Sequence, residues 1–125
     1  IENGVDKKLN IKDKKKPFSK FIMPISRSHF SKDEKDFSLK LGINKKNMIP
    51  MGSIGIKASL ICENKSDLYI NFSDKLGIWD VCVCEILIKE AGGVITDKFG
   101  KELIYNSSNK KMLKGCVISK RNIFN

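Results

Sequence analysis

The residue best placed to do chemistry is Asp80, which follows Trp79 at the start of a predicted helix. A carboxylate there can simply accept hydrogen bonds from the first-turn N–H groups, which is a structural role. It can also bind Mg²⁺, because we expect Trp79 to hold it rigidly while one oxygen faces a phosphate near the helix N-terminus. One carboxylate cannot complete a magnesium site, so both interpretations of Asp80 stay open.

Two loops offer groups that suit an anion. Gly52 and Ser53 precede a predicted helix whose first turn carries Lys57, so backbone N–H groups and an ammonium could hold a phosphate there. The spacing falls short of a P-loop, and a plain helix start with a surface lysine is the alternative. The second loop contains Ser26 and His29, the only histidine of the chain. A lone histidine is more often structural or exposed than functional.

These loops recur within a repeated order of strand, polar loop and helix. The strands are expected at 21–25, 48–51 and 68–72, and helices at 31–41, from 54 and from 79, with later strands at 94–96, 103–105 and 116–118. Ser31 and Glu34 form a capping-box pattern for the first helix, and Gly42 is expected to end it. The order predicts an α/β fold with a mixed, mostly parallel sheet flanked by helices. Ligands of such sheets bind beyond the strand ends, where these two loops and the loop before Asp80 are expected to gather.

The chain divides into two regions. Residues 1–19 are expected to form a leading strand at 9–11 and a basic linker, and residues 20–125 a single α/β lobe. The chain begins with Ile1 instead of Met, which leads us to expect a part of a longer protein.

Composition excludes several classes of protein. The chain has 125 residues and a net charge of +10, but its basic residues are 22 Lys and only 2 Arg, which disfavours a nucleic-acid partner. Much of this charge fits codon bias, since Lys, Asn and Ile have A/T-rich codons. No apolar run could span a bilayer and no secretion signal is present, so we expect a cytoplasmic protein. The four cysteines lack zinc-site spacing and are expected to be buried free thiols.

Taken together, the motifs resemble one family. The S-R-S-H run at 26–29, Gly52-Ser53 with Lys57, Trp79-Asp80, the E-A-G-G run at 90–93, and Asp97 with Gly100 occur in the order of the inositol-monophosphatase-like phosphatases. The pattern resembles their C-terminal lobe, and the S-R-S-H run favours the 3′(2′),5′-bisphosphate nucleotidase (CysQ) branch. The resemblance extends over residues 4–119.

The resemblance implies a function for each loop. Family members hydrolyse adenosine 3′,5′-bisphosphate to AMP with two or three Mg²⁺ ions, so Asp80 would bind metal and touch the substrate. It implies that Ser26 and His29 contact the nucleotide, that Ser53 and the Gly52 turn hold phosphate or ribose, and that Lys57 pairs with an anionic group. The expected partners are the nucleotide and the missing N-terminal lobe, but neither nucleic acid nor a membrane, and a homodimer is left open.

Two departures from the family pattern limit that implication. Asn71 stands where bacterial members often have arginine, and the loop at 72–78 also differs, so substrate preference is left open. No Asp-Gly-Thr occurs in the chain, although the family uses this motif of its N-terminal half to activate water. We therefore expect the chain alone to be inactive. The rival hypotheses are an inositol- or sugar-phosphate phosphatase of the same superfamily and a non-catalytic basic binding module.

Overall fold

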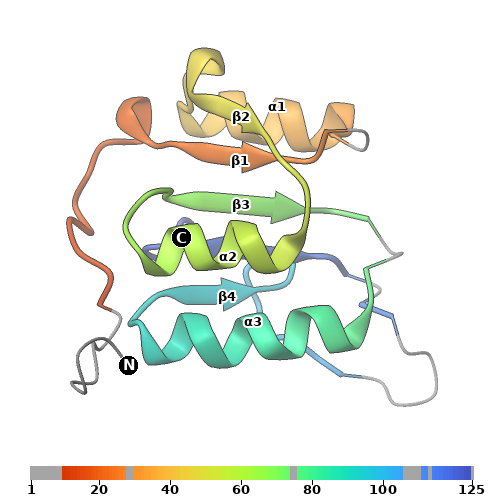
Figure 1. Ribbon diagram of the computed structural model, residues 1–125. Coiled ribbons are helices and arrows are strands. Elements are labelled where there is room, and N and C mark those ends of the chain that lie inside the picture. The colour runs from red at the N-terminus through yellow and green to blue at the C-terminus, as the bar shows by residue number, and fades with distance from the viewer. Residues whose placement is uncertain (1–9, 28–29, 74–75, 106–110, 113, 125) are drawn as a thin grey trace.

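The computed structural model describes residues 10–27, 30–73, 76–105, 111–112 and 114–124 (Figure 1). The elements follow in the order β1 (Met23–Ile25), α1 (Lys32–Leu41), β2 (Met48–Pro50), α2 (Ile54–Cys62), β3 (Leu68–Asn71), α3 (Ile78–Glu90), β4 (Val94–Thr96) and β5 (Cys116–Ser119). Two 3₁₀ turns, Phe18–Lys20 and Lys45–Asn47, precede β1 and β2. The repeated order of strand, loop and helix that the sequence predicts is therefore confirmed for β1–α1, β2–α2 and β3–α3.

Helix α1 begins and ends where its sequence predicts. The Ser31 Oγ accepts a hydrogen bond from the Glu34 N–H at 3.1 Å, and the Glu34 Oε1 accepts one from the Ser31 N–H at 2.7 Å. These two bonds satisfy N–H groups that have no partner inside the helix. Gly42 ends the helix with φ of +104°, a left-handed conformation that glycine adopts without steric cost.

The strands form one parallel pair and one antiparallel sheet. β1 lies parallel to β2 with Met23 opposite Met48, whereas β5 lies between β3 and β4 and is antiparallel to both. The α/β class is confirmed, but the expected mostly parallel pairing is wrong for this three-stranded sheet. The described part of the connection from β4 to β5 contains no helix that could return the chain to the same end of the sheet, so β5 runs in reverse. β1, β2 and β3 still point the same way (Figure 1), which places their following loops at one end.

Two shorter strand predictions are wrong. Leu103 to Tyr105 contains no strand, although Leu103 is buried and anchors the segment to the core. In the expected strand at 9–11, Asn10 and Ile11 have no regular structure, and Leu9 lies outside the described residues. The Ile11 N–H donates to the Ala91 carbonyl at 2.8 Å, and the Asn64 side chain bonds the Asn10 carbonyl and the Lys12 N–H, so isolated hydrogen bonds instead of a strand ladder fix this segment.

The sheet separates two apolar clusters. One cluster lies under α2 and α3 and includes Tyr69, whereas Leu68 and Ile70 point into the other, which packs against α1. This alternation follows from the period of two along a strand. Cys62, Cys84 and Cys116 are buried thiols and Cys82 is partly buried, largely as predicted.

A buried ion-pair cluster lies at the start of β1 and β3, at the end of these strands away from the loops that follow them. Asp67, 1% exposed, accepts hydrogen bonds from the Lys16 and Lys120 ammonium groups at 2.8 Å each and from the Ile22 N–H at 2.7 Å. Burial by itself would raise the pKa of Asp67, but these three donors outweigh it and lower the pKa. The cluster thereby joins the linker, β1, β3 and the chain after β5. Within the described residues, no helix is long and apolar enough to cross a membrane.

Candidate functional site

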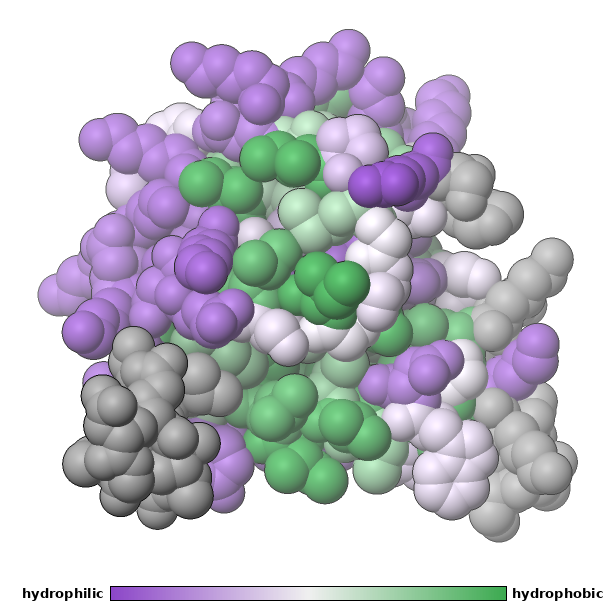
Figure 2. Space-filling view, in the orientation of Figure 1, coloured by the Kyte–Doolittle hydropathy of each residue, from purple (hydrophilic) through white to green (hydrophobic). Residues whose placement is uncertain are grey.

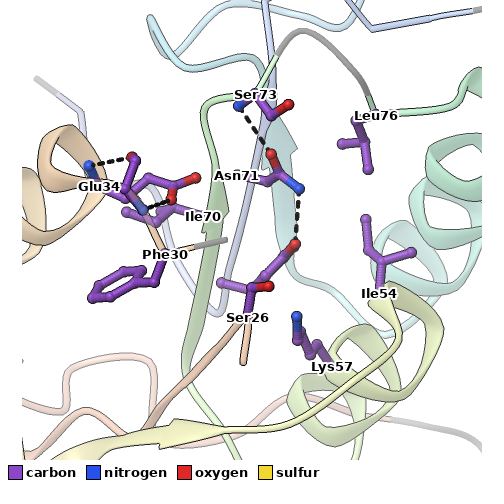
Figure 3. A pocket seen from close by; sticks show the side chains of 11 residues that line it. Ser26, Phe30, Glu34, Ile54, Lys57, Ile70, Asn71, Ser73 and Leu76 are labelled. Carbon is purple, nitrogen blue, oxygen red and sulfur yellow. Dashed lines mark hydrogen bonds between the residues drawn. The ribbon is translucent and has the colours of Figure 1, made fainter. Parts of the chain in front are cut away.

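A pocket of about 700 Å³ lies where β1 and β3 end, between α1 and α2. Polar side chains of Ser26, Asn71 and Lys57 occupy its middle, with Phe30 and Ile70 on one side and Ile54 and Leu76 on the other (Figure 3). Its remaining lining residues are Ser31, Glu34, Tyr69 and Ser73. The pocket combines hydrogen-bonding groups with apolar walls, as small-molecule sites commonly do.

Lys57 supplies the positive charge of the pocket. Its side chain is 4% exposed, and its ammonium lies 4.8 Å from the centre of the Tyr69 ring. Burial lowers the pKa of Lys57, and the negative charge of Glu34 partly opposes that shift. Lys57 has no carboxylate within 4 Å among the described residues. A desolvated ammonium held over an aromatic ring is a favourable binding group for an anion.

Tyr69, Asn71 and Ser73 are joined by hydrogen bonds. The Asn71 Nδ2 donates to the Tyr69 hydroxyl at 3.1 Å, and the Asn71 Oδ1 accepts from the Ser73 N–H at 2.9 Å. Burial raises the pKa of Tyr69 to about 12, so its hydroxyl keeps its proton at neutral pH. Tyr69 and Asn71 present neutral groups beside Lys57 and fix the direction of the chain that leaves β3.

Glu34 connects α1 to that same segment. Besides its Oε1 bond to the Ser31 N–H, its Oε2 accepts a hydrogen bond from the Phe72 N–H at 2.7 Å. Glu34 is 4% exposed, so both oxygens are satisfied away from water. The capping box therefore also sets the position of the loop between β3 and α3.

The structure brings only part of the predicted site together. Ser26 and Lys57 line the pocket, whereas Gly52 and Ser53 lie exposed before α2 and are not among its lining residues. Ser53 caps α2, and its Oγ accepts from the Ile56 N–H at 3.5 Å, so its position here fits the structural interpretation. His29 lies outside the described residues.

Asp80 lies in the first turn of α3, exposed and outside the pocket lining. Trp79 does not cover it as expected, because the Trp79 side chain is 76% exposed. An exposed carboxylate suits Mg²⁺ as one hard oxygen ligand. Among the described residues, no group of three or more metal-binding side chains exists, so Asp80 would need ligands from elsewhere to complete a site.

Comparisons with known proteins identify the family. The model of the inositol monophosphatase family matches residues 3–121, nearly the whole chain. The chain belongs to the inositol monophosphatase family. The fold agrees: CysQ from Bacteroides thetaiotaomicron, described as a bacterial member of this family, matches with a TM-score of 0.64 and 28% identity, over 81% of this chain and 38% of that protein.

Several curated relatives are named bisphosphate nucleotidases. The rat protein named 3′(2′),5′-bisphosphate nucleotidase 1 is 30% identical over 85% of this chain and 34% of its own length. The Dictyostelium discoideum protein of the same name is 29% identical over 82% of this chain and 33% of its own length. The chain thus spans about one third of the curated relatives that it matches.

The remaining motif residues of this inositol monophosphatase family chain build its framework. A Cβ on Gly93 would come within 2.7 Å of the Ile11 side chain and 3.1 Å of the Ser119 carbonyl, so only glycine fits there. The Asp97 Oδ1 accepts hydrogen bonds from the N–H groups of Phe99 and Lys101 at 2.8 and 3.0 Å and closes the turn after β4. Gly93 allows the close approach between α3 and β4, Asp97 orders the turn after β4, and neither lines the pocket.

Residue types alone did not single out Tyr69 as a lining residue, nor the apolar walls at Phe30, Ile54 and Leu76. The strand alternation contained a usable signal, because it puts Tyr69 and Asn71 on the same face of β3. The apolar wall residues have no such signal in the sequence, because apolar residues near a helix start belong to the core as often as they line a pocket.

Proposed function

We propose that the chain is the substrate-binding lobe of a Mg²⁺-dependent phosphoric monoester hydrolase that converts adenosine 3′,5′-bisphosphate to AMP and phosphate. The observation that carries the proposal is the pocket in which the buried Lys57 ammonium lies between apolar walls. A nucleotide has the matching chemistry, with anionic phosphates for Lys57 and a flat base for the walls. The names of the curated relatives support this substrate class.

Each residue has a role in this proposal. Lys57 pairs with a phosphate, Ser26 bonds the nucleotide within the pocket, and Asn71 orders the loop after β3. Gly52, Ser53 and His29 stay candidates for contacts with phosphate, ribose or base. When bound, Mg²⁺ would neutralise charge on the transferring phosphoryl group, and Asp80 would be its ligand from this chain. Because the described residues offer no further metal cluster, we expect the chain alone to be inactive.

Two alternative functions would use different groups of the chain. The family match also admits an inositol- or sugar-phosphate phosphatase, whose polar substrate would leave the walls of Phe30, Ile54 and Leu76 against hydroxyl groups. A basic binding module would use scattered surface lysines and would not depend on Lys57. We do not expect nucleic acid to be a partner. We propose a cytoplasmic location for the protein and leave a homodimer open.

Calorimetric titration with adenosine 3′,5′-bisphosphate, AMP and inositol 1-phosphate tests the proposal. Replacing Lys57 by Met removes a desolvated charge and should weaken binding of the bisphosphate by about 30-fold or more. Lys40→Met is the matched control, because Lys40 is exposed on α1 away from the pocket lining, and it should leave the affinity unchanged.

Equal effects of Lys57→Met and Lys40→Met would refute the pocket assignment. Tighter binding of inositol 1-phosphate would support the sugar-phosphate alternative. Hydrolysis at a normal enzyme rate by the isolated chain with Mg²⁺ would refute its assignment as an inactive lobe.

A further inference from the structure

The pocket is lined by two opposite charges. Of the described residues that line it, only Lys57 and Glu34 are charged, and each is 4% exposed. The negative charge of Glu34 reaches Lys57, because it opposes the lowering of the Lys57 pKa that burial causes. Since both side chains are buried, water screens neither charge well. A ligand in this pocket therefore meets one positive and one negative group.

The Glu34 carboxylate is held in place at the wall of the pocket. Its Oε1 accepts a hydrogen bond from the Ser31 N–H and its Oε2 accepts one from the Phe72 N–H, both at 2.7 Å. Figure 3 shows Glu34 on the α1 side, near Phe30 and Ile70. A carboxylate on a solvated surface side chain could swing away from an arriving anion. Glu34 would first have to break two buried hydrogen bonds.

Asn71 adds no second positive charge to the pocket. Its amide is engaged on both sides, donating to the Tyr69 hydroxyl and accepting from the Ser73 N–H (Figure 3). Arg27 follows Ser26 in the chain, but it is exposed and is not a lining residue. Among the described lining residues, Lys57 is thus the single cation, and it can balance only part of the charge of one phosphate.

Exposed lysines gather at the other end of the strands. Lys12, Lys14, Lys15 and Lys20 are exposed in the linker and in the turn before β1. Figure 2 shows the hydrophilic surface there, on the left of the view. None of these lysines lines the pocket, and physiological salt screens exposed charges beyond about 8 Å. They attract anions in general, but they cannot replace a cation inside the pocket.

We propose that Glu34 is a specificity-determining residue, which admits one phosphate group to the pocket and keeps a second one out. The inference rests on the proposed function, because it takes the pocket as the nucleotide site. Lys57 pairs with one phosphate, whereas a second phosphate inside the pocket would lie against the Glu34 carboxylate without a cation of its own. The bisphosphate therefore binds with its other phosphate outside the pocket. Without metal, it gains little affinity over AMP.

Metal-free calorimetric titrations with AMP and adenosine 3′,5′-bisphosphate measure this selectivity as the ratio of the two dissociation constants. We expect the two constants to agree within about threefold in the wild-type chain. Glu34→Gln keeps the shape of the side chain and removes its charge, so the ratio should shift about fivefold in favour of the bisphosphate. A loop that is merely loosened would weaken both ligands by the same factor and leave the ratio unchanged.

Asp33→Asn is the matched control for Glu34→Gln. It removes the same charge from the first turn of α1, but Asp33 is exposed and is not a lining residue. The ratio should therefore stay at its wild-type value. Inorganic phosphate and pyrophosphate, followed through the Phe72 amide signal in NMR, repeat the comparison without a nucleoside, and Glu34→Gln should again favour the more highly charged ligand.

Two results would overturn the inference. One is a selectivity that Glu34→Gln leaves unchanged in both pairs of ligands, or changes no more than Asp33→Asn does. The other is a wild-type chain that binds the bisphosphate tenfold or more tightly than AMP without metal. If the nucleotides do not bind but the phosphate pair shows the expected shift, the proposed substrate is wrong and the role of Glu34 is supported.

Discussion

Replacing Asp67 by asparagine should cost the fold a large share of its stability. Asp67 is 1% exposed and pairs with Lys120, itself 3% exposed, at 2.8 Å. The amide oxygen of the new side chain could still accept the Ile22 N–H bond, but the Lys120 ammonium would be left buried without a counter-charge. Removing one partner of a buried ion pair costs about 3 to 5 kcal/mol. Lys16 adds less to this loss, because its side chain is 22% exposed and reaches water.

The loss should depend on pH in a definite direction. Because the pKa of Asp67 is lowered in the folded chain, its ionised form stabilises the fold above the unfolded pKa of about 3.9. That stabilisation disappears as the pH falls through the lower, folded pKa. The wild-type chain and Asp67→Asn should therefore differ fully at pH 7 and converge in strongly acidic solution.

Urea unfolding followed by far-ultraviolet circular dichroism measures the effect, with an expected fall in the midpoint of about 2 M. Lys89→Ala is the control, because Lys89 pairs with Glu85 at 3.1 Å on the surface and should change stability by about 0.5 kcal/mol or less. Combining Asp67→Asn with Lys120→Met should recover part of the loss. The reasoning is refuted if Asp67→Asn costs less than about 1 kcal/mol, or if the double variant is no more stable than the single one.

Three further predictions follow from packing and charge. Gly93→Ala should lower the free energy of unfolding by about 1 to 3 kcal/mol, as measured by thermal unfolding. Gly52→Ala should leave that free energy almost unchanged, because its added Cβ meets nothing within 4 Å. Glu34→Gln should cost about 1 to 3 kcal/mol and speed hydrogen exchange at the Ser31 or the Phe72 amide, since the single oxygen of glutamine can replace only one of the two carboxylate acceptors; unchanged exchange at both amides would contradict this. Affinity for adenosine 3′,5′-bisphosphate should fall on raising the pH, beginning below the ordinary lysine pKa of 10.5, since only charged Lys57 attracts phosphate; a pH-independent affinity in calorimetry would contradict it.

Local signals made most elements predictable from sequence. The pair Ser31 and Glu34 specified the start of α1, and Gly42 specified its end, because helix termini are decided by groups a few residues apart. The helix expected from Trp79 was also predictable, since Val81, Cys84 and Ile88 lie at helical spacing and are buried in the structure. Both predictions depend only on neighbours in the sequence.

Long-range features were not predictable in this way. The reversed pairing of β5 between β3 and β4 depends on which strands meet, and no local pattern records that choice. The segment from Leu103 to Tyr105 has the composition of a strand, but Tyr105 instead donates a hydrogen bond to Glu85 on α3 at 2.7 Å. Trp79 was misjudged for a related reason, because no local pattern decides whether its side chain covers Asp80 or, as here, stays 76% exposed.

Only part of the candidate site was predictable, because the pocket residues and Asp80 are positioned by different parts of the fold. Lys57 and Ser26 follow directly from the loops that come after β2 and β1, and the parallel directions of those strands bring them to one pocket. Asp80 lies outside that pocket, and its exposed carboxylate faces no metal-binding cluster of the described residues. The pocket therefore offers a desolvated positive charge, and α3 offers a solvated negative one. In the proposed function these two charges have separate partners, a phosphate for Lys57 and a divalent cation for Asp80.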